Sequence, residues 1–213
     1  AGPTQEPVDA VRYLSNRSSG RMGFALAAEA AARGARVIIV SGPVTIDPPA
    51  GCELERVTTT DEMYQAVLER LSEASIVVMA AAAADYRPAI AHESKIKKDS
   101  GARTLDLELT VDILAEIGRL KGDRVLVGFA AETENLVENA QAKLRRKNCD
   151  FIVANPVGAA AEGAGIDSEE NQGVLLSAAG ERVEFPRGSK TAMASRVFDE
   201  LLRLRPTRAA AGD

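Results

Sequence analysis

The residues best suited to chemistry gather in one stretch, where a carboxylate and several amines follow a run of alanines. Asp85 comes directly after the five alanines of residues 80–84, and Lys95 begins the basic cluster of residues 95–98. Small side chains leave room for another molecule, and Pro88 prevents a continuous helix between Asp85 and Lys95. Carboxylate oxygens bind Mg²⁺, and lysine amines bind phosphates. The stretch predicts a phosphate and metal site; a solvated basic cluster after a strand is an alternative of about equal weight.

The element that positions these residues is the apolar, β-branched run at residues 76–79, which is typical of a strand buried in a parallel sheet. Ligands of open α/β sheets bind outside the carboxyl ends of the strands, where Asp85 and Lys95 would lie. Similar runs predict further strands, at residues 37–40, 54–57, 125–129 and 151–156. We expect an α/β fold: a three-layer, Rossmann-like or ribokinase-like domain with a mostly parallel central sheet and a C-terminal β-hairpin at residues 174–186.

Helices are expected between these strands, at residues 24–33, from 60 onward, at 111–120, 136–147 and 190–204. Ser18 or Ser19 is suited to cap the first of them, and Gly20 lets a ligand approach its first turn. A helix N-terminus with free N–H groups is a ready anion site. Ser189 is expected to cap the last helix.

Composition excludes several classes of function. With 213 residues, a net charge of −5 and 4% aromatic residues, the chain does not resemble a nucleic-acid-binding protein. Cys52 and Cys149 lie far apart, so two free thiols are expected and neither a zinc site nor a disulfide framework. The longest apolar run is too short for a membrane helix, so no membrane partner is expected. We interpret residues 1–206 as one domain, a piece of a longer protein or an excised domain, followed by a disordered tail at 207–213.

Dinucleotide binding is disfavoured because the Rossmann GxGxxG motif is absent. Gly20 and Gly23 give only GxxG, and no strand leads tightly into it.

The chemistry-bearing residues occur in an order that resembles a known family. The motifs are Ser-Asn16-Arg-Ser-Ser-Gly20, Ala-Asp85-Tyr, Lys95-Ile-Lys-Lys98, Gly128-Phe-Ala-Ala-Glu-Thr133, Lys143 to Lys147, and Ala154-Asn155. Together they resemble phosphopantothenoylcysteine synthetase, the C-terminal domain of the bacterial bifunctional phosphopantothenoylcysteine decarboxylase/phosphopantothenate–cysteine ligase. The resemblance spans residues 1 to about 204, and the ordered set is more specific than any single motif.

The resemblance implies a reaction in coenzyme A biosynthesis. CTP activates 4′-phosphopantothenate as an acyl-cytidylate with release of pyrophosphate, and the amine of L-cysteine then displaces CMP. It implies Mg²⁺ and CTP as co-substrate, a cytoplasmic homodimer, and an N-terminal decarboxylase domain in the full-length protein. FMN is not expected on this domain.

The resemblance also assigns roles to residues of this sequence. Lys95 contacts the triphosphate, with Lys143 and Lys147 as further nucleotide contacts. Asn16 contacts the acyl-cytidylate carbonyl, where an amide donor would stabilise oxyanion charge. Asp85 matches a nucleotide-site residue, and we infer that it holds the Mg²⁺.

The remaining assignments concern the substrate and the dimer. The residues that match the family's cytidine-binding wall are Ala81, Ala82, Ala83, Asp112 and Phe129. Ser18, Ser19 and Gly20 match the site that holds the phosphate of phosphopantothenate. Asp9 and Arg12 match the segment at the dimer interface. The loop at residues 97–106 corresponds to a flap that closes over the intermediate.

Two other classes of function remain open. A non-catalytic nucleotide-sensing module would need the phosphate site but would not need Asn16 or Lys95. A Rossmann-type oxidoreductase would need a nicotinamide site. The residues alone do not decide between CTP and ATP. They also do not decide whether the isolated domain dimerises, whether it has a regulatory pocket, or in which order its substrates bind.

Overall fold

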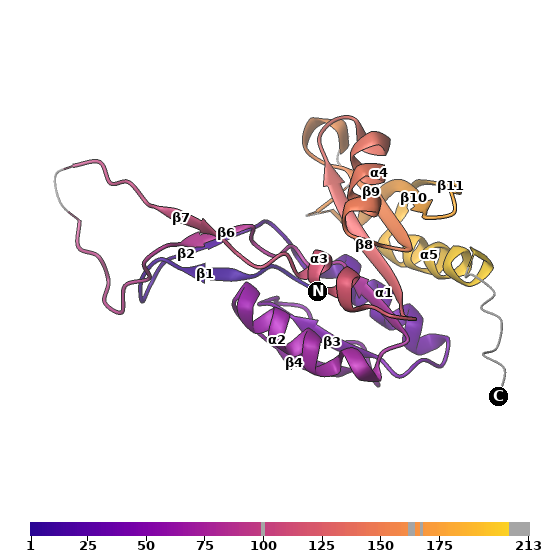
Figure 1. Ribbon diagram of the computed structural model, residues 1–213, viewed down its shortest axis with the longest axis horizontal. Helices are drawn as coiled ribbons and strands as arrows, with labels where there is room; N and C mark the ends of the chain where they lie inside the picture. Colours follow the sequence, from indigo (N-terminus) through magenta and orange to yellow (C-terminus); the bar gives the residue numbers. More distant parts are fainter. Residues whose placement is uncertain (99–100, 162–164, 167, 205–213) are drawn as a thin grey trace.

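The computed structural model describes residues 1–98, 101–161, 165–166 and 168–204. Its centre is a five-stranded sheet with the strand order β11-β10-β9-β8-β5 (Figure 1). The strands are β5 (Ile76–Met79), β8 (Val125–Glu132), β9 (Phe151–Pro156), β10 (Glu170–Ser177) and β11 (Arg182–Ser189).

The central sheet is mixed. β5, β8 and β9 are parallel, whereas β10 pairs antiparallel with both β9 and β11. The expected C-terminal hairpin is therefore present, and it belongs to the central sheet. The α/β class is confirmed, with the correction that two of the four pairings are antiparallel because the hairpin joins the sheet at its edge.

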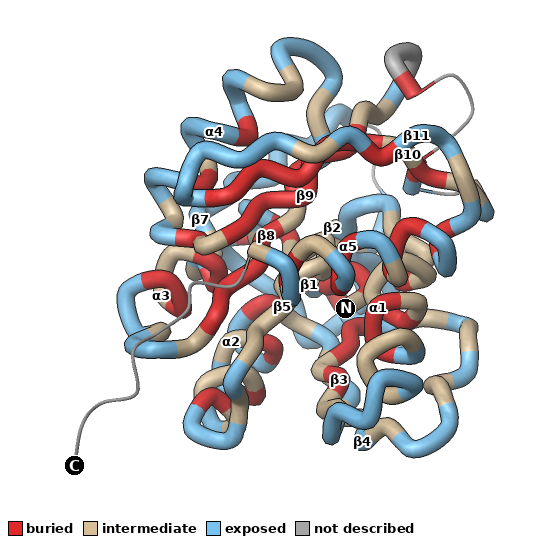
Figure 2. Tube along the Cα trace, turned by 90° about the vertical axis from the view of Figure 1, so that its right-hand side faces the viewer, coloured by how far each residue is buried: buried red, intermediate tan, exposed pale blue. Residues whose placement is uncertain are grey.

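Two apolar clusters lie on opposite faces of this sheet. Helices α2 (Thr60–Arg70), α3 (Ile113–Leu120) and α4 (Leu136–Arg146) pack against residues such as Leu126 and Ile152. Helices α1 (Arg21–Ala32) and α5 (Lys190–Leu204) pack against residues such as Val127 and Val153. The strands β8, β9 and β10 are buried along most of their length (Figure 2), because apolar side chains leave them in both directions.

The remaining strands form three separate pairs. β3 (Ile38–Ser41) pairs in parallel with β4 (Glu53–Arg56) beside α2. β1 (Gln5–Pro7) pairs with β2 (Tyr13–Ser15), and β6 (Tyr86–Pro88) pairs with β7 (Leu107–Leu109). The last two pairs project together from the body (Figure 1), and we call β1, β2, β6, β7 and the described residues that connect them the arm.

Local capping explains most of the helix starts. Thr59 and Glu62 form a capping box at α2, the Asp112 side chain accepts from the Ala115 amide at α3, and Ser189 accepts from the Ala192 amide as predicted. At α1 the prediction of a serine cap is wrong. Gly20 occupies the cap position with φ 75°, a left-handed conformation that suits glycine and not serine.

Other boundaries differ by a few residues. β8 continues past Phe129 to Glu132, and β10 begins at Glu170, inside a stretch that lacks periodicity. Short 3₁₀ turns occupy Leu71–Glu73 and Gly158–Ala161. Residues 207–213, expected to be a disordered tail, lie outside the described residues.

Two further observations bear on the sequence predictions. Cys52 and Cys149 are both free thiols, and burial raises the pKa of Cys149 to about 11. Among the described residues, no helix is long and apolar enough to cross a membrane.

Candidate active site

A cleft of about 490 Å³ opens where β5 and β8 end, between α3 and α4. Seven of the nine residues predicted to bind the nucleotide line it: Ala81, Ala83, Asp85, Asp112, Phe129, Lys143 and Lys147. They come from four separate segments of the chain. The parallel strands β5 and β8 bring them together, because both strands end at the same edge of the sheet.

Lys143 of α4 and Lys147, the C-cap residue of that helix, bring positive charge to the cleft. Lys143 and Lys147 are four positions apart, so they lie on the same face of the helix. Lys143 donates to the backbone oxygen of Phe129 at 2.8 Å, and burial lowers the pKa of its amine. Lys147 forms an ion pair with Asp112, whose other carboxylate oxygen caps α3. The cleft thus holds one desolvated amine and one that is paired with a carboxylate.

Asp85 supplies an available carboxylate at the mouth of the cleft. Its backbone oxygen accepts from the Thr110 amide at 3.0 Å, whereas no hydrogen bond or ion pair from a described residue engages its carboxylate. The described residues contain no group of three or more His, Cys, Asp or Glu side chains arranged to hold a metal. The donor set therefore fits an ion such as Mg²⁺ that takes one carboxylate from the protein and its other ligands from phosphates and water.

Ala82 does not line the cleft, unlike its neighbours Ala81 and Ala83. Its amide donates to the backbone oxygen of Gly2 at 2.9 Å, and Pro3 and Ala82 form a parallel bridge. Successive residues of an extended segment face opposite sides, so Ala82 faces the N-terminal residues when its neighbours face the cleft.

Asn16 connects the cleft wall to the loop ahead of α1. Its side-chain nitrogen donates to the backbone oxygen of Ala83 at 2.8 Å and to that of Ala82 at 3.4 Å. Neither contact was predictable from a local pattern, because 66 and 67 positions separate the partners.

The predicted phosphate loop lies at the start of α1. Gly20 is the N-cap residue of the helix, and its amide donates to the Ser18 hydroxyl at 3.3 Å. The Ser19 hydroxyl donates to the backbone oxygen of Ile166 at 3.2 Å. The first N–H groups of α1 carry a partial positive charge, which favours an anion at this point.

Lys95 is not brought into the cleft of its own chain. It is exposed and lies in the arm, where the next residue, Ile96, donates its amide to Asp9 at 3.0 Å. Arg12 donates to the backbone oxygen of Ile96 and forms an ion pair with Asp9. The hydrogen bond from Arg12 holds the pKa of Asp9 well below its usual range. Asp9 is buried within the chain and fixes the Lys95 segment, whereas the Arg12 side chain is half exposed.

Three polar residues of the cleft were not predicted: Glu132, Asn139 and Arg146. The side-chain nitrogen of Asn139 donates to the Glu132 carboxylate at 3.0 Å. The signal that could have revealed two of them is helical spacing, because Asn139 and Arg146 lie four residues before and three residues after Lys143.

Comparisons with known proteins show what the chain is similar to. The family described as "DNA/pantothenate metabolism flavoprotein C-terminal domain" matches residues 1–204. Over 205 residues the chain is 43% identical to "Coenzyme A biosynthesis bifunctional protein CoaBC" of Bacillus subtilis (strain 168), covering 96% of this chain and 50% of that protein. Over 206 residues it is 42% identical to "Cysteine/Cysteine sulfinic acid decarboxylase" of an unknown prokaryotic organism, covering 96% of this chain and 57% of that protein.

A solved structure is similar along nearly its whole length. The crystal structure of the C-terminal domain of "Coenzyme A biosynthesis bifunctional protein CoaBC" has a TM-score of 0.81 and 37% sequence identity, covering 96% of this chain and 92% of that chain. The chain spans about half the length of the curated CoaBC relatives that it matches.

Proposed function

The chain belongs to the family of DNA/pantothenate metabolism flavoprotein C-terminal domains, and from this premise we propose that it is a phosphopantothenate–cysteine ligase of coenzyme A biosynthesis. The observation that carries the proposal is the cleft at the ends of β5 and β8, in which Lys143 of α4 and its C-cap residue Lys147 lie with Asp85 beside a wall of alanines. A nucleoside triphosphate needs these features: positive charge, a metal ligand and a flat apolar wall.

In the first half-reaction, the carboxylate of 4′-phosphopantothenate attacks the α-phosphorus of CTP. A new C–O–P linkage forms, the bond between the α- and β-phosphates breaks, and pyrophosphate leaves with the bonding electrons. Lys143 and Lys147 stabilise the charge that develops on the phosphates. Mg²⁺ held by Asp85 would neutralise further phosphate charge when bound.

In the second half-reaction, the amine of cysteine attacks the acyl carbon. The amide bond forms, CMP leaves, and the amine nitrogen loses a proton. The side-chain nitrogen of Asn16 donates one N–H to Ala83 at 2.8 Å and makes a longer contact of 3.4 Å with Ala82. We propose that the N–H of the longer contact donates to the acyl carbonyl oxygen instead when the intermediate is bound. The N-terminus of α1, with Ser18, Ser19 and Gly20, would hold the phosphate of the same substrate.

The cleft wall supports a nucleotide base at this place. Ala81 and Ala83 present small side chains, Phe129 presents an aromatic one, and Lys143 fixes the backbone at Phe129. We propose CTP as the nucleotide. Turnover with ATP alone would keep the mechanism and overturn the choice of base.

A homodimer explains why Lys95 stands away from the cleft of its own chain. Lys95 lies on the arm, and we propose that the arm delivers it to the cleft of a partner subunit, with Arg12 at the interface. A mixture of Lys95→Gln and Lys143→Met chains tests this. Each chain alone is expected to have strongly reduced activity, and mixing them should restore part of the activity, because a mixed dimer has one site with both lysines. If mixing restores nothing although mixed dimers form, Lys95 acts within its own chain.

The activity itself is tested by mixing the protein with CTP, Mg²⁺ and 4′-phosphopantothenate, with and without L-cysteine. Pyrophosphate release should need phosphopantothenate, and CMP should appear only after cysteine is added. Nucleotide binding without pyrophosphate release would favour the sensing module. Release of CO₂ from cysteine without any nucleotide would point to the decarboxylase chemistry named for one relative. The full-length protein is proposed to carry an N-terminal decarboxylase domain and to act in the cytoplasm.

A further inference from the structure

Three buried polar side chains lie behind the alanine wall of the cleft. Thr4 and Thr60 are fully buried, and Glu6 is 2% exposed. Glu6 belongs to β1, and Thr60 is the first residue of α2. None of the three lines the cleft, and the proposed reaction uses none of them.

Hydrogen bonds connect the alanine run to the first turn of α2 through these side chains. The Ala84 amide donates to the Thr4 hydroxyl at 2.9 Å, and the hydroxyl oxygens of Thr4 and Thr60 are 2.9 Å apart. The Thr60 hydroxyl donates to the Glu6 carboxylate at 2.7 Å, and the Thr60 amide donates to the same oxygen at 2.9 Å. The carboxylate thus lies at a helix N-terminus, where the partial positive charge stabilises it.

Proton counting gives this chain of bonds a direction. A hydroxyl has one proton to donate, and an ionised carboxylate only accepts. The Thr60 proton therefore goes to Glu6 and not to the Ala84 oxygen, which lies 3.4 Å from the hydroxyl. Thr4 then donates to Thr60 and accepts from the Ala84 amide. In the opposite direction, Glu6 would lose the Thr60 proton, and the buried Thr4 proton would have no acceptor in the chain of bonds.

The chain of bonds ends beside Asp85. The Ala84 oxygen accepts from the Thr110 hydroxyl at 2.5 Å, and the Asp85 oxygen accepts from the Thr110 amide at 3.0 Å. The backbone is therefore fixed on both sides of the Asp85 side chain, whose carboxylate stays exposed at the cleft. A ligand held in this way loses little conformational freedom when it binds a cation.

We propose that Glu6, Thr60 and Thr4 are positioning residues, which hold the Asp85 carboxylate where it binds the divalent cation of the nucleotide. They act through the Ala84 peptide and touch neither the cation nor the nucleotide. Glu6 fixes the direction of the whole chain of bonds because it accepts without donating. The inference rests on the proposed function, since it needs Asp85 as the ligand of the cation.

The test measures how much Mg²⁺ tightens the binding of CTP. Calorimetric titration gives the dissociation constant of CTP in EDTA and in Mg²⁺, and the ratio of the two is compared between variants. Asp85→Asn should lower this ratio by about tenfold or more, because it removes the charged ligand. Thr60→Val should lower it by about threefold, less than is typical of a group that contacts the metal ligand directly. Thr60→Ser keeps the hydroxyl and should restore the ratio.

Thr58→Val is the matched control for the loss of a hydroxyl. Thr58 is exposed and lies two positions before Thr60, and its backbone oxygen accepts from the Gln5 amide. This variant should leave the ratio unchanged. Hydrogen exchange supplies a second measurement, in which Thr60→Val should quicken exchange of the Ala84 amide by about tenfold although Thr4 is intact, and Thr58→Val should not.

A double variant separates positioning of Asp85 from a merely structural role. In the Asp85→Asn background, Thr60→Val should lower the ratio no further, because no carboxylate is left to position. A purely structural role would lower the unfolding temperature of Thr60→Val without changing the ratio. An equal loss with and without Asp85 would show that Thr60 acts on the whole cleft; either result would overturn the inference.

The same data distinguish the inference from the proposed function. A lower ratio in Asp85→Asn but not in Thr60→Val would overturn the inference and leave Asp85 as the metal ligand. An unchanged ratio in Asp85→Asn would overturn Asp85 as the metal ligand and the inference with it. If Thr60→Val does not fold, NMR of the unaltered protein decides. The Thr4 and Thr60 hydroxyl protons should give resonances that exchange slowly with water, and their absence would contradict the chain of bonds.

Discussion

The side-chain amide of Asn16 donates a 2.8 Å hydrogen bond to the backbone oxygen of Ala83, 67 positions further along the chain. This bond fixes the loop ahead of α1 against the alanine run that lines the cleft. The proposed phosphate site at the helix start and the proposed nucleotide site are therefore coupled through one side chain. Changes at Asn16 are expected to affect the transfer between the two substrates more than the binding of either.

Asn16→Asp should separate the two half-reactions. A carboxylate has no N–H to donate, so it stabilises neither Ala83 nor an oxyanion. The acyl-cytidylate should accumulate while cysteine capture slows, measured as rapid pyrophosphate release followed by slow CMP release. Asn16→Ala removes the donor without adding charge and should show the same order of events. Normal rates in both half-reactions would refute the assignment of Asn16 to the acyl carbonyl.

Lys143→Met should weaken CTP binding. The methionine keeps much of the length of the side chain but removes the partly buried amine that lines the cleft. Calorimetric titration should show a loss of affinity of about tenfold or more, which corresponds to about 1.4 kcal/mol or more. Arg145→Met is the matched control, since Arg145 is an exposed cation on the same helix that does not line the cleft. Equal losses in both variants would mean that only the overall charge of α4 matters.

Asp112 has two roles that substitutions can distinguish. Asp112→Ala removes the cap of α3 and should lower the free energy of unfolding by about 1 kcal/mol. Asp112→Asn keeps a capping oxygen but removes the ion pair with Lys147, and it should change stability by less than about 0.5 kcal/mol because the Asp112 carboxylate is half exposed, so water screens the pair. Urea unfolding measures both. A larger loss in the asparagine variant would mean that the pair, and not the cap, stabilises this region.

The buried amino group of Ala1 should make stability depend on pH. Its pKa is about 5 when folded and near 8 when unfolded, so the unfolded chain binds more protons between these values. The free energy of unfolding of the chain beginning at Ala1 should rise as the pH is raised from about 5 to about 8. Acetylation of the amine removes this titration, so the difference between free and acetylated chains isolates it. Parallel curves for the two chains would contradict the burial of a charged terminus.

Asp9→Asn should release the segment that carries Lys95. The Asp9 carboxylate accepts from the amides of Val11, Arg12 and Ile96 and from the Arg12 side chain. An asparagine loses the charge that holds Arg12, so exchange of the Ile96 amide should quicken and turnover should fall. Glu108→Gln, which removes another carboxylate of the arm, should change neither. Unchanged exchange at Ile96 would mean that Arg12 and Asp9 are not what fixes this segment.

The sequence by itself determined the elements whose signal is local. The apolar runs at residues 76–79 and 151–156 predicted β5 and β9 within their observed bounds, because β-branched residues and flanking turn residues act over a few positions. The order of motifs along the chain indicated the family, and the resemblance assigned Lys143 and Lys147 to the nucleotide site. Most of the lining of the cleft was thus predictable.

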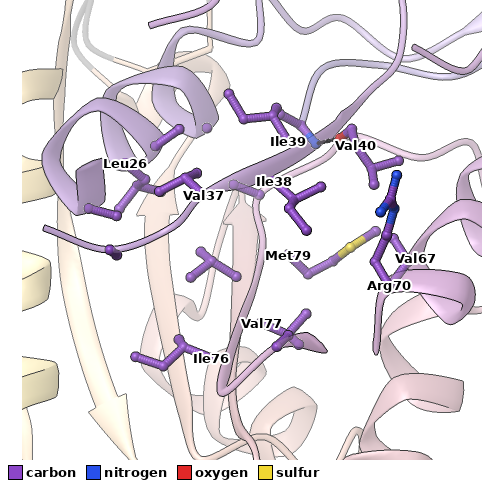
Figure 3. Close-up of a pocket in the computed structure, with 18 of the residues that line it drawn as sticks. Leu26, Val37, Ile38, Ile39, Val40, Val67, Arg70, Ile76, Val77 and Met79 are labelled. Atoms are coloured by element: carbon purple, nitrogen blue, oxygen red, sulfur yellow. Dashed lines mark hydrogen bonds between the residues drawn. The ribbon is translucent and has the colours of Figure 1, made fainter. Parts of the chain in front are cut away.

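The tertiary structure alone decided which segments meet. In the structure, Ala82 faces away from the cleft, Lys95 lies on the arm, and Gly20 is the N-cap residue of α1. The packing also leaves a cavity between β3 and β5 (Figure 3), which is why β5, expected to be buried on both faces, is only half-buried. Each of these outcomes depends on hydrogen bonds or packing between residues distant in the chain. Hydrophobic periodicity records that a residue is buried, but it carries no information about the partner that buries it.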